Sequence, residues 1–267
     1  MTADSPSVAV ADAFSRAATA YDHHGTLQRR AATALMAGLP AEMPADVGPA
    51  QVLDLGCGTG DLARRLRARF PGAAIDGFDI APGMVAACRE AWADDPWARF
   101  VIADIGSAAN RIQADIIASS FALQWLADGP TCVAGWSEMV RPGGVLAIAV
   151  PVAGSLAGLA ARYEAMTGRR FPGLDYATAE RYTAAVQAAG LEVVHRAHED
   201  LAMPDGDSLE LLRCLRKLGA TGTPRNDHRP VSAGELRRVL RAQIAPAERA
   251  GNGFRMLYLV ARRGEGA

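Results

Sequence analysis

The sequence lacks the features of a protein that is exported, spans a membrane or binds nucleic acid through its overall charge. Lysine occurs once and the net charge is only -1 at pH 7, so no strong field would attract an anionic polymer or membrane surface. No run of about 18 apolar residues is present, which argues against a transmembrane helix. The first residues also lack a basic segment followed by an apolar one, the pattern of a secretion signal. We therefore expect a cytoplasmic protein without a membrane or nucleic-acid partner.

Cysteine is scarce as well. The four thiols, at Cys57, Cys88, Cys132 and Cys214, are separated by 31, 44 and 82 residues, and these spacings match no metal-binding knuckle. We expect reduced cysteines that pack as small apolar side chains, and no bound metal. The five histidines form no obvious catalytic constellation.

Apolar residues, by contrast, make up 50% of the chain and charged residues 21%, a composition that can form a core and argues against disorder. Beyond residue 50, strand-like apolar segments alternate with helical patterns. Five such segments are "QVLDLGCG", "AAIDGFDIA", "ARFVIADI", "ADIIASSFALQWL" and "VLAIAVPV". This alternation predicts a parallel, doubly wound sheet of the α/β class. The helical pattern before the fifth strand is expected to stop at Pro142 and Gly143.

Two further strand candidates, "LEVVHRAHEDLAM" and "GFRMLYLVARR", would bring the sheet to seven strands. About 45 residues separate them, many more than a hairpin needs, and they contain the helical patterns "SLELLRCLRKLG" and "SAGELRRVLRAQI". We therefore expect helices inserted between strands six and seven.

The segment "VLDLGCGTGDL", residues 52–62, places Gly56, Gly58 and Gly60 directly after the first strand. Such a strand–loop–helix unit lets a ligand approach the backbone closely. Asp61 stands where a dinucleotide-binding loop would have its third glycine, and no lysine of a Walker motif follows. Asp54 just before the loop would repel a phosphate and attract an amine. The loop is therefore not expected to bind a pyrophosphate.

The stretch "LDLGCGTG" resembles motif I of the class I S-adenosylmethionine-dependent methyltransferases. The resemblance implies a Rossmann-like fold and S-adenosylmethionine (SAM) as the cofactor, with S-adenosylhomocysteine (SAH) as its product. It also implies that Asp79, 25 residues after Asp54, binds the ribose hydroxyls and that Asp104 binds the adenine amine. "SSFALQW" matches motif IV, which faces the methyl group and the substrate. The cofactor-binding residues predicted in this way are Asp54, Gly56, Cys57, Gly58, Gly60, Asp79, Ile80, Met84, Asp104, Ile105 and Ser120.

Segments along nearly the whole chain resemble the malonyl-acyl-carrier-protein O-methyltransferases of biotin synthesis. They are "VADAFSRAATAYDHHGTLQRRAATALM", "FALQW", "RPGGVLAIAV" with "GSLAGL", "SLELLRCLRKLGATGT", "VSAGELRRVL" and "YLVARR". Two positions depart from the family pattern: Gly25 replaces a common alanine, and "GNGFRMLYLV" lacks the usual Pro-Leu-Thr-Tyr. The resemblance implies an N-terminal helical lid and linker over residues 1–48 and a methyltransferase domain over 49–267. An inserted substrate or carrier-docking region would cover about 205–250.

An enzyme of this kind methylates the free carboxylate of a malonyl thioester on acyl carrier protein and so starts the synthesis of the biotin precursor. A carboxylate is already ionised at pH 7, so no general base is expected, and alignment of the reacting atoms can carry the catalysis. We expect Tyr21, Gln124 and Trp125 to position the reactants, although Tyr21 and Trp125 could equally be ordinary packing residues. Arg29, Arg30 and Arg162 are candidates to hold the substrate carboxylate by paired hydrogen bonds, and the sequence does not choose between them.

Residues 213–241 contain eight basic and two acidic side chains. A solvated helix face is one explanation. Our preferred hypothesis is that Arg213, Arg216 and Lys217 dock the acidic acyl carrier protein, because complementary charge steers and orients partners.

Two other functions stay open from the sequence. One is a methyltransferase for another small carboxylic acid, such as aconitate, or for a quinone precursor, whose C-methylation would need a base. The other is a SAM-binding regulatory or partner protein without activity.

Overall fold

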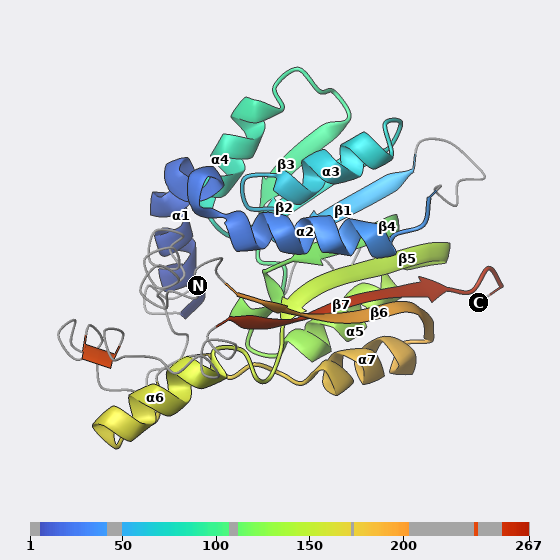
Figure 1. Cartoon of the computed structure of the whole chain (residues 1–267). Coiled ribbons are helices and arrows are strands. Elements are labelled where there is room, and N and C mark those ends of the chain that lie inside the picture. The colour runs from blue at the N-terminus through green and yellow to red at the C-terminus, as the bar shows by residue number, and fades with distance from the viewer. Residues whose placement is uncertain are drawn as a thin grey trace.

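The computed structural model describes residues 6–41, 50–106, 112–171, 174–202, 238–239 and 253–266. Its centre is a seven-stranded sheet with the order β3-β2-β1-β4-β5-β7-β6 (Figure 1). The strands are β1 (Gln51–Leu55), β2 (Ala74–Asp79), β3 (Ala98–Ile102), β4 (Ala114–Ser120), β5 (Val140–Pro151), β6 (Leu191–Leu201) and β7 (Phe254–Arg263). Strands β1 to β5 pair in parallel, and β7 is antiparallel to both β5 and β6. The predicted class I methyltransferase fold is thus confirmed.

Helices cover both faces of the sheet, as expected when parallel strands are joined by right-handed crossovers. The helices are α1 (Pro6–His24), α2 (Thr26–Gly38), α3 (Asp61–Arg69), α4 (Pro82–Ala91), α5 (Gly129–Glu138), α6 (Ala157–Thr167) and α7 (Ala179–Ala188), with the short 3-10 turn η1 (Leu123–Trp125). Residues of α2 and α3 share one core cluster with one face of the sheet. Residues of α5 and α7 share a second cluster with the other face.

Strand β1 shows how the sequence divides the two layers. Three of its five residues, Val52, Leu53 and Leu55, are apolar, as expected where both faces of a central parallel strand are buried. Val52 belongs to the cluster under α2 and α3, whereas Leu53 and Leu55 belong to the cluster under α5 and α7. All three side chains are fully buried. The strand therefore holds its carboxyl end, and the glycine loop that follows, in a fixed position.

One boundary expected from the sequence is wrong. Helix α5 ends at Glu138, and Pro142 and Gly143 lie inside β5, which begins at Val140. The pairing of β5 with β4 shifts register between Ala114 and Ile116, and Gly143 has a φ of 74°. A bulge of this kind accommodates a proline and a left-handed glycine in a strand, so these two residues do not mark the end of the preceding helix.

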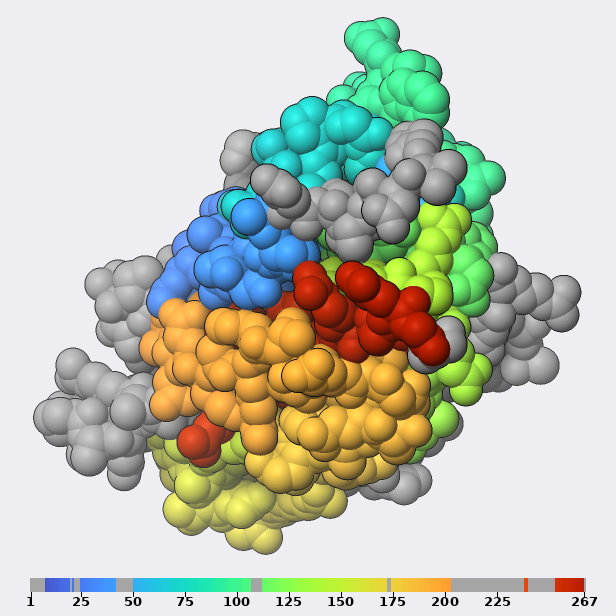
Figure 2. Space-filling view, turned by 90° about the vertical axis from the view of Figure 1, so that its right-hand side faces the viewer, coloured from blue at the N-terminus to red at the C-terminus, as the bar shows by residue number. Residues whose placement is uncertain are grey.

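Helix α2 and the C-terminal strands lie side by side although they are far apart in sequence. Figure 2 shows α2 (blue) against β6 (orange) and the end of β7 (red). Arg30 of α2 forms an ion pair with Glu199 of β6 at 2.9 Å, and Tyr258 of β7 donates a hydrogen bond to the same carboxylate at 2.8 Å. Helix α2 is thus a part of the main body of the fold.

Two expected segments fall largely outside the described residues: the proline-rich linker that ends the predicted lid and the inserted region at about 205–250. Among the described helices, none is long and apolar enough to cross a membrane. Within the same part of the chain, no group of three potential metal ligands occurs.

Candidate functional site: a cavity at the carboxyl edge of the sheet

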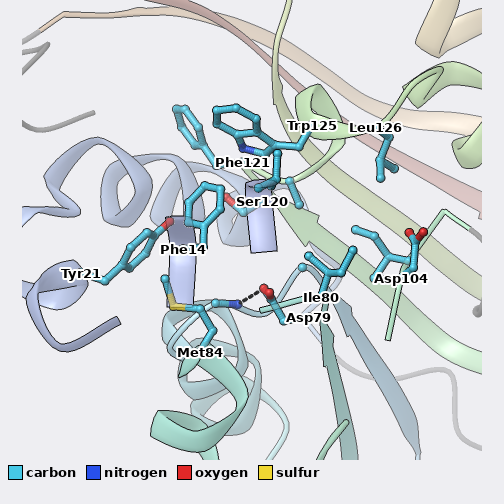
Figure 3. Close-up of a pocket in the computed structure, with 15 residues that line it drawn as sticks. Phe14, Tyr21, Asp79, Ile80, Met84, Asp104, Ser120, Phe121, Trp125 and Leu126 are labelled. Atoms are coloured by element: carbon cyan, nitrogen blue, oxygen red, sulfur yellow. Dashed lines mark hydrogen bonds between the residues drawn. The ribbon is translucent and has the colours of Figure 1, made fainter. Parts of the chain in front are cut away.

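A cavity lies where the carboxyl ends of β1, β2 and β4 meet, close to the point at which the strand order reverses. Ligands of open parallel sheets bind at this position. About 680 Å³ of space free of protein atoms, part of it open to solvent, lies between its lining residues. Figure 3 shows its lining residues converging from the sheet, from α1 and from α4. They are Val10, Phe14, Tyr21, Gly56, Gly58, Asp79, Ile80, Met84, Asp104, Ile105, Ser120, Phe121, Ala122, Trp125 and Leu126.

The glycine loop forms the floor of the cavity. Gly56, Gly58 and Gly60 have φ values of 80°, 53° and 85°, a region that residues with a side chain rarely adopt. A Cβ on Gly56 would lie 2.2 Å from the Cβ of Ala122, so glycine also allows the loop after β4 to approach. The loop is anchored because the amides of Gly56 and Cys57 both donate to the carbonyl of Phe78, at 2.8 and 3.0 Å.

Asp79 ends β2 and joins the glycine loop to the start of α4. Its two carboxylate oxygens accept hydrogen bonds from the amides of Gly58 and Ala81, each at 2.9 Å, and the bond to Gly58 is drawn in Figure 3. Burial raises the pKa of Asp79, while the amides that donate to it act in the opposite direction. Each oxygen keeps a further lone pair for a ligand, so Asp79 can accept hydrogen bonds from hydroxyl groups in the cavity.

Asp104 and Ile105 form another part of the wall, after β3. The Oδ1 atom of Asp104 accepts a hydrogen bond from the amide of Gly106 at 2.9 Å. The carbonyl of Ile105 accepts one from the indole Nε1 of Trp136 at 3.1 Å. These bonds hold a carboxylate next to an apolar side chain at the rim, which suits a ring that is flat, apolar on its faces and polar at its edge.

Aromatic side chains of α1 and of η1 form the side of the cavity that faces the strand ends, here called the roof. Phe14 of α1 packs edge-on against Trp125 of η1, with ring centroids 5.4 Å apart and planes at 80°. Tyr21, two turns further along α1, lies 6.3 Å from Phe14. Figure 3 shows Phe14 and Tyr21 on the α1 side, next to Met84, with Asp79 farther across the cavity. The aromatic rings therefore give this side of the cavity an apolar surface.

Ser120 is the last residue of β4, and its side chain reaches the cavity. Its hydroxyl oxygen is buried and has no hydrogen-bond partner among the described residues. Gln124 donates from its Nε2 to the carbonyl of Phe121 at 2.8 Å, while its Oε1 is buried without a partner. Unsatisfied buried polar atoms are costly, so their presence beside a cavity points to a ligand that would satisfy them.

Sequence comparisons identify the kind of protein that carries this cavity. Residues 52–144 match a family described as a methyltransferase domain. A malonyl-[acyl-carrier protein] O-methyltransferase of Enterobacter lignolyticus is 35% identical over 213 residues, 80% of this chain and 80% of that protein. The chain belongs to the malonyl-[acyl-carrier protein] O-methyltransferase family. It is therefore a SAM-dependent methyltransferase.

Two other similarities bear on this methyltransferase. A trans-aconitate 2-methyltransferase of Deinococcus radiodurans is 45% identical over 103 residues, which cover 38% of each chain. Among solved structures, one chain of the complex between the Haloferax volcanii Trm112 methyltransferase activator and a methyltransferase superposes with a TM-score of 0.60. The identity there is 21%, and the match covers 97% of this chain and 99% of the other. At that identity the likeness shows the shared fold alone.

The cavity of the methyltransferase fits SAM by the chemistry of its walls. The cofactor combines an adenine ring, a ribose and a methionine part with an ammonium group. Asp79 could accept from the ribose hydroxyls, and Asp104 lies beside the apolar Ile105 where an adenine ring could bind. Gly56 and Gly58, which have no side chains, leave room for the methionine part. Ile80 and Met84 add apolar surface to the wall of the cavity.

Three predicted cofactor residues, Asp54 at the end of β1 and Cys57 and Gly60 in the loop, are not among the lining residues. Asp54 is fully buried, and neither of its carboxylate oxygens has a hydrogen bond of normal geometry among the described residues. Burial and the nearby Asp79 carboxylate raise its pKa to about 8, although the amide of Ala63 acts in the opposite direction. Gly60 is the N-cap residue of α3. The described contacts do not test whether these residues touch the cofactor.

Cys57 points toward a second thiol behind the loop. The sulfurs of Cys57 and Cys88 lie 3.8 and 3.2 Å from the carbonyl oxygen of Gly58. Its neighbour Cys88 and burial raise the pKa of Cys57, so its thiol stays protonated and is a poor nucleophile. Both are free cysteines.

The arginines predicted to hold a substrate carboxylate do not line this cavity. Arg29 lies on α2 and donates to Thr26 at 3.2 Å, and Arg162 is a buried residue of α6. Arg30, also on α2, forms its ion pair with Glu199. Gln124 lines a neighbouring hollow with Asp128, Tyr176 and Tyr182. The remaining candidates, Arg213, Arg216 and Lys217, lie outside the described residues. Their roles stay predictions.

Several lining residues were not predicted: Val10, Phe14, Phe121, Ala122 and Leu126. Val10 and Phe14 share the helical periodicity of the N-terminus, but periodicity alone does not distinguish a roof from ordinary core packing. Phe121 and Ala122 lie within the motif IV segment. Phe121 has a φ of 55°, an uncommon value for a residue with a large side chain, and no sequence pattern announces it.

Proposed function

We propose that this methyltransferase transfers the methyl group of SAM to the free carboxylate of a malonyl thioester carried on acyl carrier protein. The product is the malonyl methyl ester from which the biotin precursor is built. Support comes from the relatives that carry this name and from the character of the cavity. The observation that carries the proposal is a cavity with aromatic side chains over the strand ends and with two lining carboxylates, Asp79 and Asp104, that already accept hydrogen bonds from backbone amides.

The chain's own residues account for the expected mechanism. When bound, SAM supplies an electrophilic methyl group on a positively charged sulfur. Phe14, Trp125 and Met84 surround the space with apolar surface and exclude water, which would otherwise stabilise the separate charges of the reactants more than the dispersed charge of the transition state. An ionised acceptor needs no proton removed. Holding the reactants in line can supply roughly 7 kcal/mol of the lowered barrier.

Ser120 and Gln124 are the side chains that we propose for positioning the acceptor. Both have a buried oxygen without a partner among the described residues. Ser120 lines the cavity, and its hydroxyl can donate to a carboxylate. Gln124 lines the neighbouring hollow, and its Oε1 can accept from a ligand, while its Nε2 already donates to the carbonyl of Phe121. Tyr21, from the roof, could close the same space.

The decisive experiment incubates the full-length protein with SAM and malonyl-acyl carrier protein and follows the carrier by mass spectrometry. We expect the mass of one methylene group to be added and to be confined to the malonyl unit, with one SAH formed per methyl transferred. Holo-carrier protein without the malonyl group is the matched control and should stay unmodified. Methylation of the control, or SAH formed without any change to the malonyl group, would contradict the proposed acceptor.

A second candidate acceptor is a free small carboxylic acid such as trans-aconitate. The observation in its favour is the 45% identity over 103 residues to a trans-aconitate methyltransferase. Both acceptors are ionised carboxylates, so they share the mechanism and differ in what binds outside the cavity. Comparing kcat/KM for malonyl-acyl carrier protein and for trans-aconitate under the same conditions decides between them. A pH profile that requires a deprotonated group near pH 7 would instead favour C-methylation of a quinone precursor.

The basic segment 213–241 supports the carrier rather than a free acid, since acyl carrier proteins are acidic and complementary charge orients partners. Charge reversal at Arg213, Arg216 and Lys217 should raise KM for the carrier-bound substrate far more than for malonyl-coenzyme A. Equal effects on the two substrates would exclude docking by these residues.

A further inference from the structure

The N-terminus of α4 is capped by a residue of another helix. The first amides of a helix have no partner within it, and the N-cap residue of α4, Ala81, has no side chain that could accept from them. The amide of Gly83 instead donates to the hydroxyl oxygen of Ser15 in α1, at 3.2 Å. Helix α1 therefore supplies a polar contact that α4 lacks in its own sequence.

Gly83 also lies so near the backbone of Ser15 that a side chain would not fit between the two helices. A Cβ at this position would lie 2.5 Å from the carbonyl oxygen of Ser15 and 2.8 Å from its Cα. These are backbone atoms, so they cannot turn aside as the end of a flexible side chain could. Adding one methyl group would force the helices apart.

The glycine has no other evident purpose at this position. Gly83 is absent from the described glycines with positive φ, so its backbone conformation is open to alanine. Alanine is the better helix former, and α4 by itself would favour it. The contact with Ser15 is the feature of the structure that an alanine could not accommodate.

This contact sits directly beside the cavity. Ser15 follows Phe14, whose ring packs on Trp125, and Ala18 of the next turn packs with Ala81 and Met84. Helix α1 thus rests on α4 through Ser15 and Ala18 and reaches η1 through Phe14. A shift at Gly83 would move the roof relative to the floor.

We propose that Gly83 is a positioning residue for the cofactor: by lacking a side chain, it lets α1 dock on α4 through Ser15 and holds Phe14 and Tyr21 over the cavity. The inference rests on the proposed function in that the cavity is taken to bind SAM. Gly83 acts through α1, without lining the cavity itself. Its replacement should loosen the roof and speed the loss of the bound nucleoside.

The test compares Gly83→Ala and Ser15→Ala with the unaltered full-length protein. Calorimetry with SAH gives the affinity, and hydrogen exchange reports the protection of the α1 amides. For Gly83→Ala we expect Kd for SAH to rise about tenfold or more, equivalent to about 1.4 kcal/mol, with faster exchange confined to α1. Ser15→Ala removes one hydrogen bond without adding bulk, and Kd should rise about 3- to 10-fold.

Gly72→Ala is the matched control, because no heavy atom lies within 4 Å of a Cβ at that position; it should bind SAH as the unaltered protein does. If Gly83→Ala fails to fold, Ser15→Ala still tests the contact. Unchanged affinity and unchanged α1 exchange in Gly83→Ala, with normal SAH binding by the unaltered protein, would overturn the inference and leave the proposed function standing. Failure of the unaltered protein to bind SAH would overturn the proposed function first, and this inference with it.

Discussion

The two N-terminal helices are joined at Gly25, yet they belong to regions with different tasks. Helix α2 buries Leu27, Ala31, Ala32 and Leu35 in the main core under the sheet. Helix α1 packs through a small separate cluster around Ala18, Ala81 and Met84 and covers the carboxyl edge. The first region is close-packed and stabilises the fold, whereas the second encloses a space for ligands.

Polar groups differ between the same two regions. At the exposed edge of the contact between α2 and strands β6 and β7, the charged groups are paired: Arg30 forms an ion pair with Glu199, and Tyr258 donates a hydrogen bond to the same carboxylate. At the carboxyl edge, buried oxygens of Asp54, Ser120 and Gln124 lack hydrogen-bond partners among the described residues. Unsatisfied buried groups lower the stability of the folded chain. At the carboxyl edge, the same groups remain available for hydrogen bonds with a ligand. Substitutions in the interior should therefore change folding, and substitutions at the edge should change ligand binding or its dependence on pH.

The largest effect is expected in the interior. Leu35 is fully buried, and Leu35→Ala should lower the free energy of unfolding by about 2–5 kcal/mol, because it removes apolar contacts and leaves a cavity. Denaturation with urea, at equal m-values, measures the change. Met166→Ala, at an exposed residue of α6, is the control and should be nearly neutral. A loss below about 1 kcal/mol in Leu35→Ala would mean that α2 is not a part of the cooperative core.

Asp54 should make the stability of the edge depend on pH. Its pKa is about 8 in the folded chain against an ordinary value of 3.8, so between these values the folded state binds one proton more than the unfolded state. This contribution to stability is present at low pH and is lost as the pH rises toward 8, with a slope of up to about 1.4 kcal/mol per pH unit. Asp54→Asn removes the titrating group and should flatten this part of the profile.

Unfolding of both proteins by urea at several values of pH between 5 and 8 measures the difference in slope. The pKa of Asp79 is also raised, so a residual slope is expected in Asp54→Asn, and the difference between the two proteins is the informative quantity. Parallel profiles would show that Asp54 is ionised in the folded chain throughout this range.

Substitution of Phe14 should affect ligand binding more than the free energy of unfolding, in contrast to substitution of Leu35. Phe14→Ala removes the edge-on contact with Trp125, and aromatic pairs contribute about 0.5–1.5 kcal/mol beyond burial. We expect SAH affinity to fall by about this amount and the stability of the ligand-free protein to change much less than in Leu35→Ala. Calorimetry and urea unfolding of the same preparations give both values. A large loss of stability with unchanged affinity would place α1 in the core instead.

The smallest effect is expected at the Arg30–Glu199 pair. The two side chains are 46% and 36% exposed, and exposed ion pairs contribute about 0.2–1 kcal/mol because solvent screens them. Arg30→Met keeps most of the aliphatic stem and removes the charge. Its effect on unfolding should shrink further at high salt, whereas an effect that is independent of salt would point to packing of the stem.

Features encoded within a short stretch were predictable from the sequence. Gly56, Gly58 and Gly60 follow an apolar strand and take positive φ values as expected for such a loop. Asp79 ends β2 and Asp104 follows β3. Because these strands pair in parallel, their carboxyl ends lie at the same edge of the sheet. The end of α5 was misplaced because Pro142 and Gly143 interrupt a helix as readily as they mark a bulge, and the local sequence does not distinguish the two.

Contacts between distant segments could not be predicted in the same way. Phe14 meets Trp125, Ser15 meets Gly83 and Ala122 meets Gly56, all between elements whose relative placement depends on the packing of the whole sheet. The hydrophobic periodicity of the sequence does not indicate how close residues of different elements come to one another.

By itself, the sequence determined the alternation of strands and helices, the glycine loop and the carboxylates at the strand ends, because each depends on neighbours within a few residues or on a regular repeat. The tertiary structure alone decided which side chains form the roof, why Gly83 must lack a Cβ and which buried oxygens stay without partners. These depend on close packing between segments far apart in the chain, where differences of a few tenths of an ångström separate contact from clash.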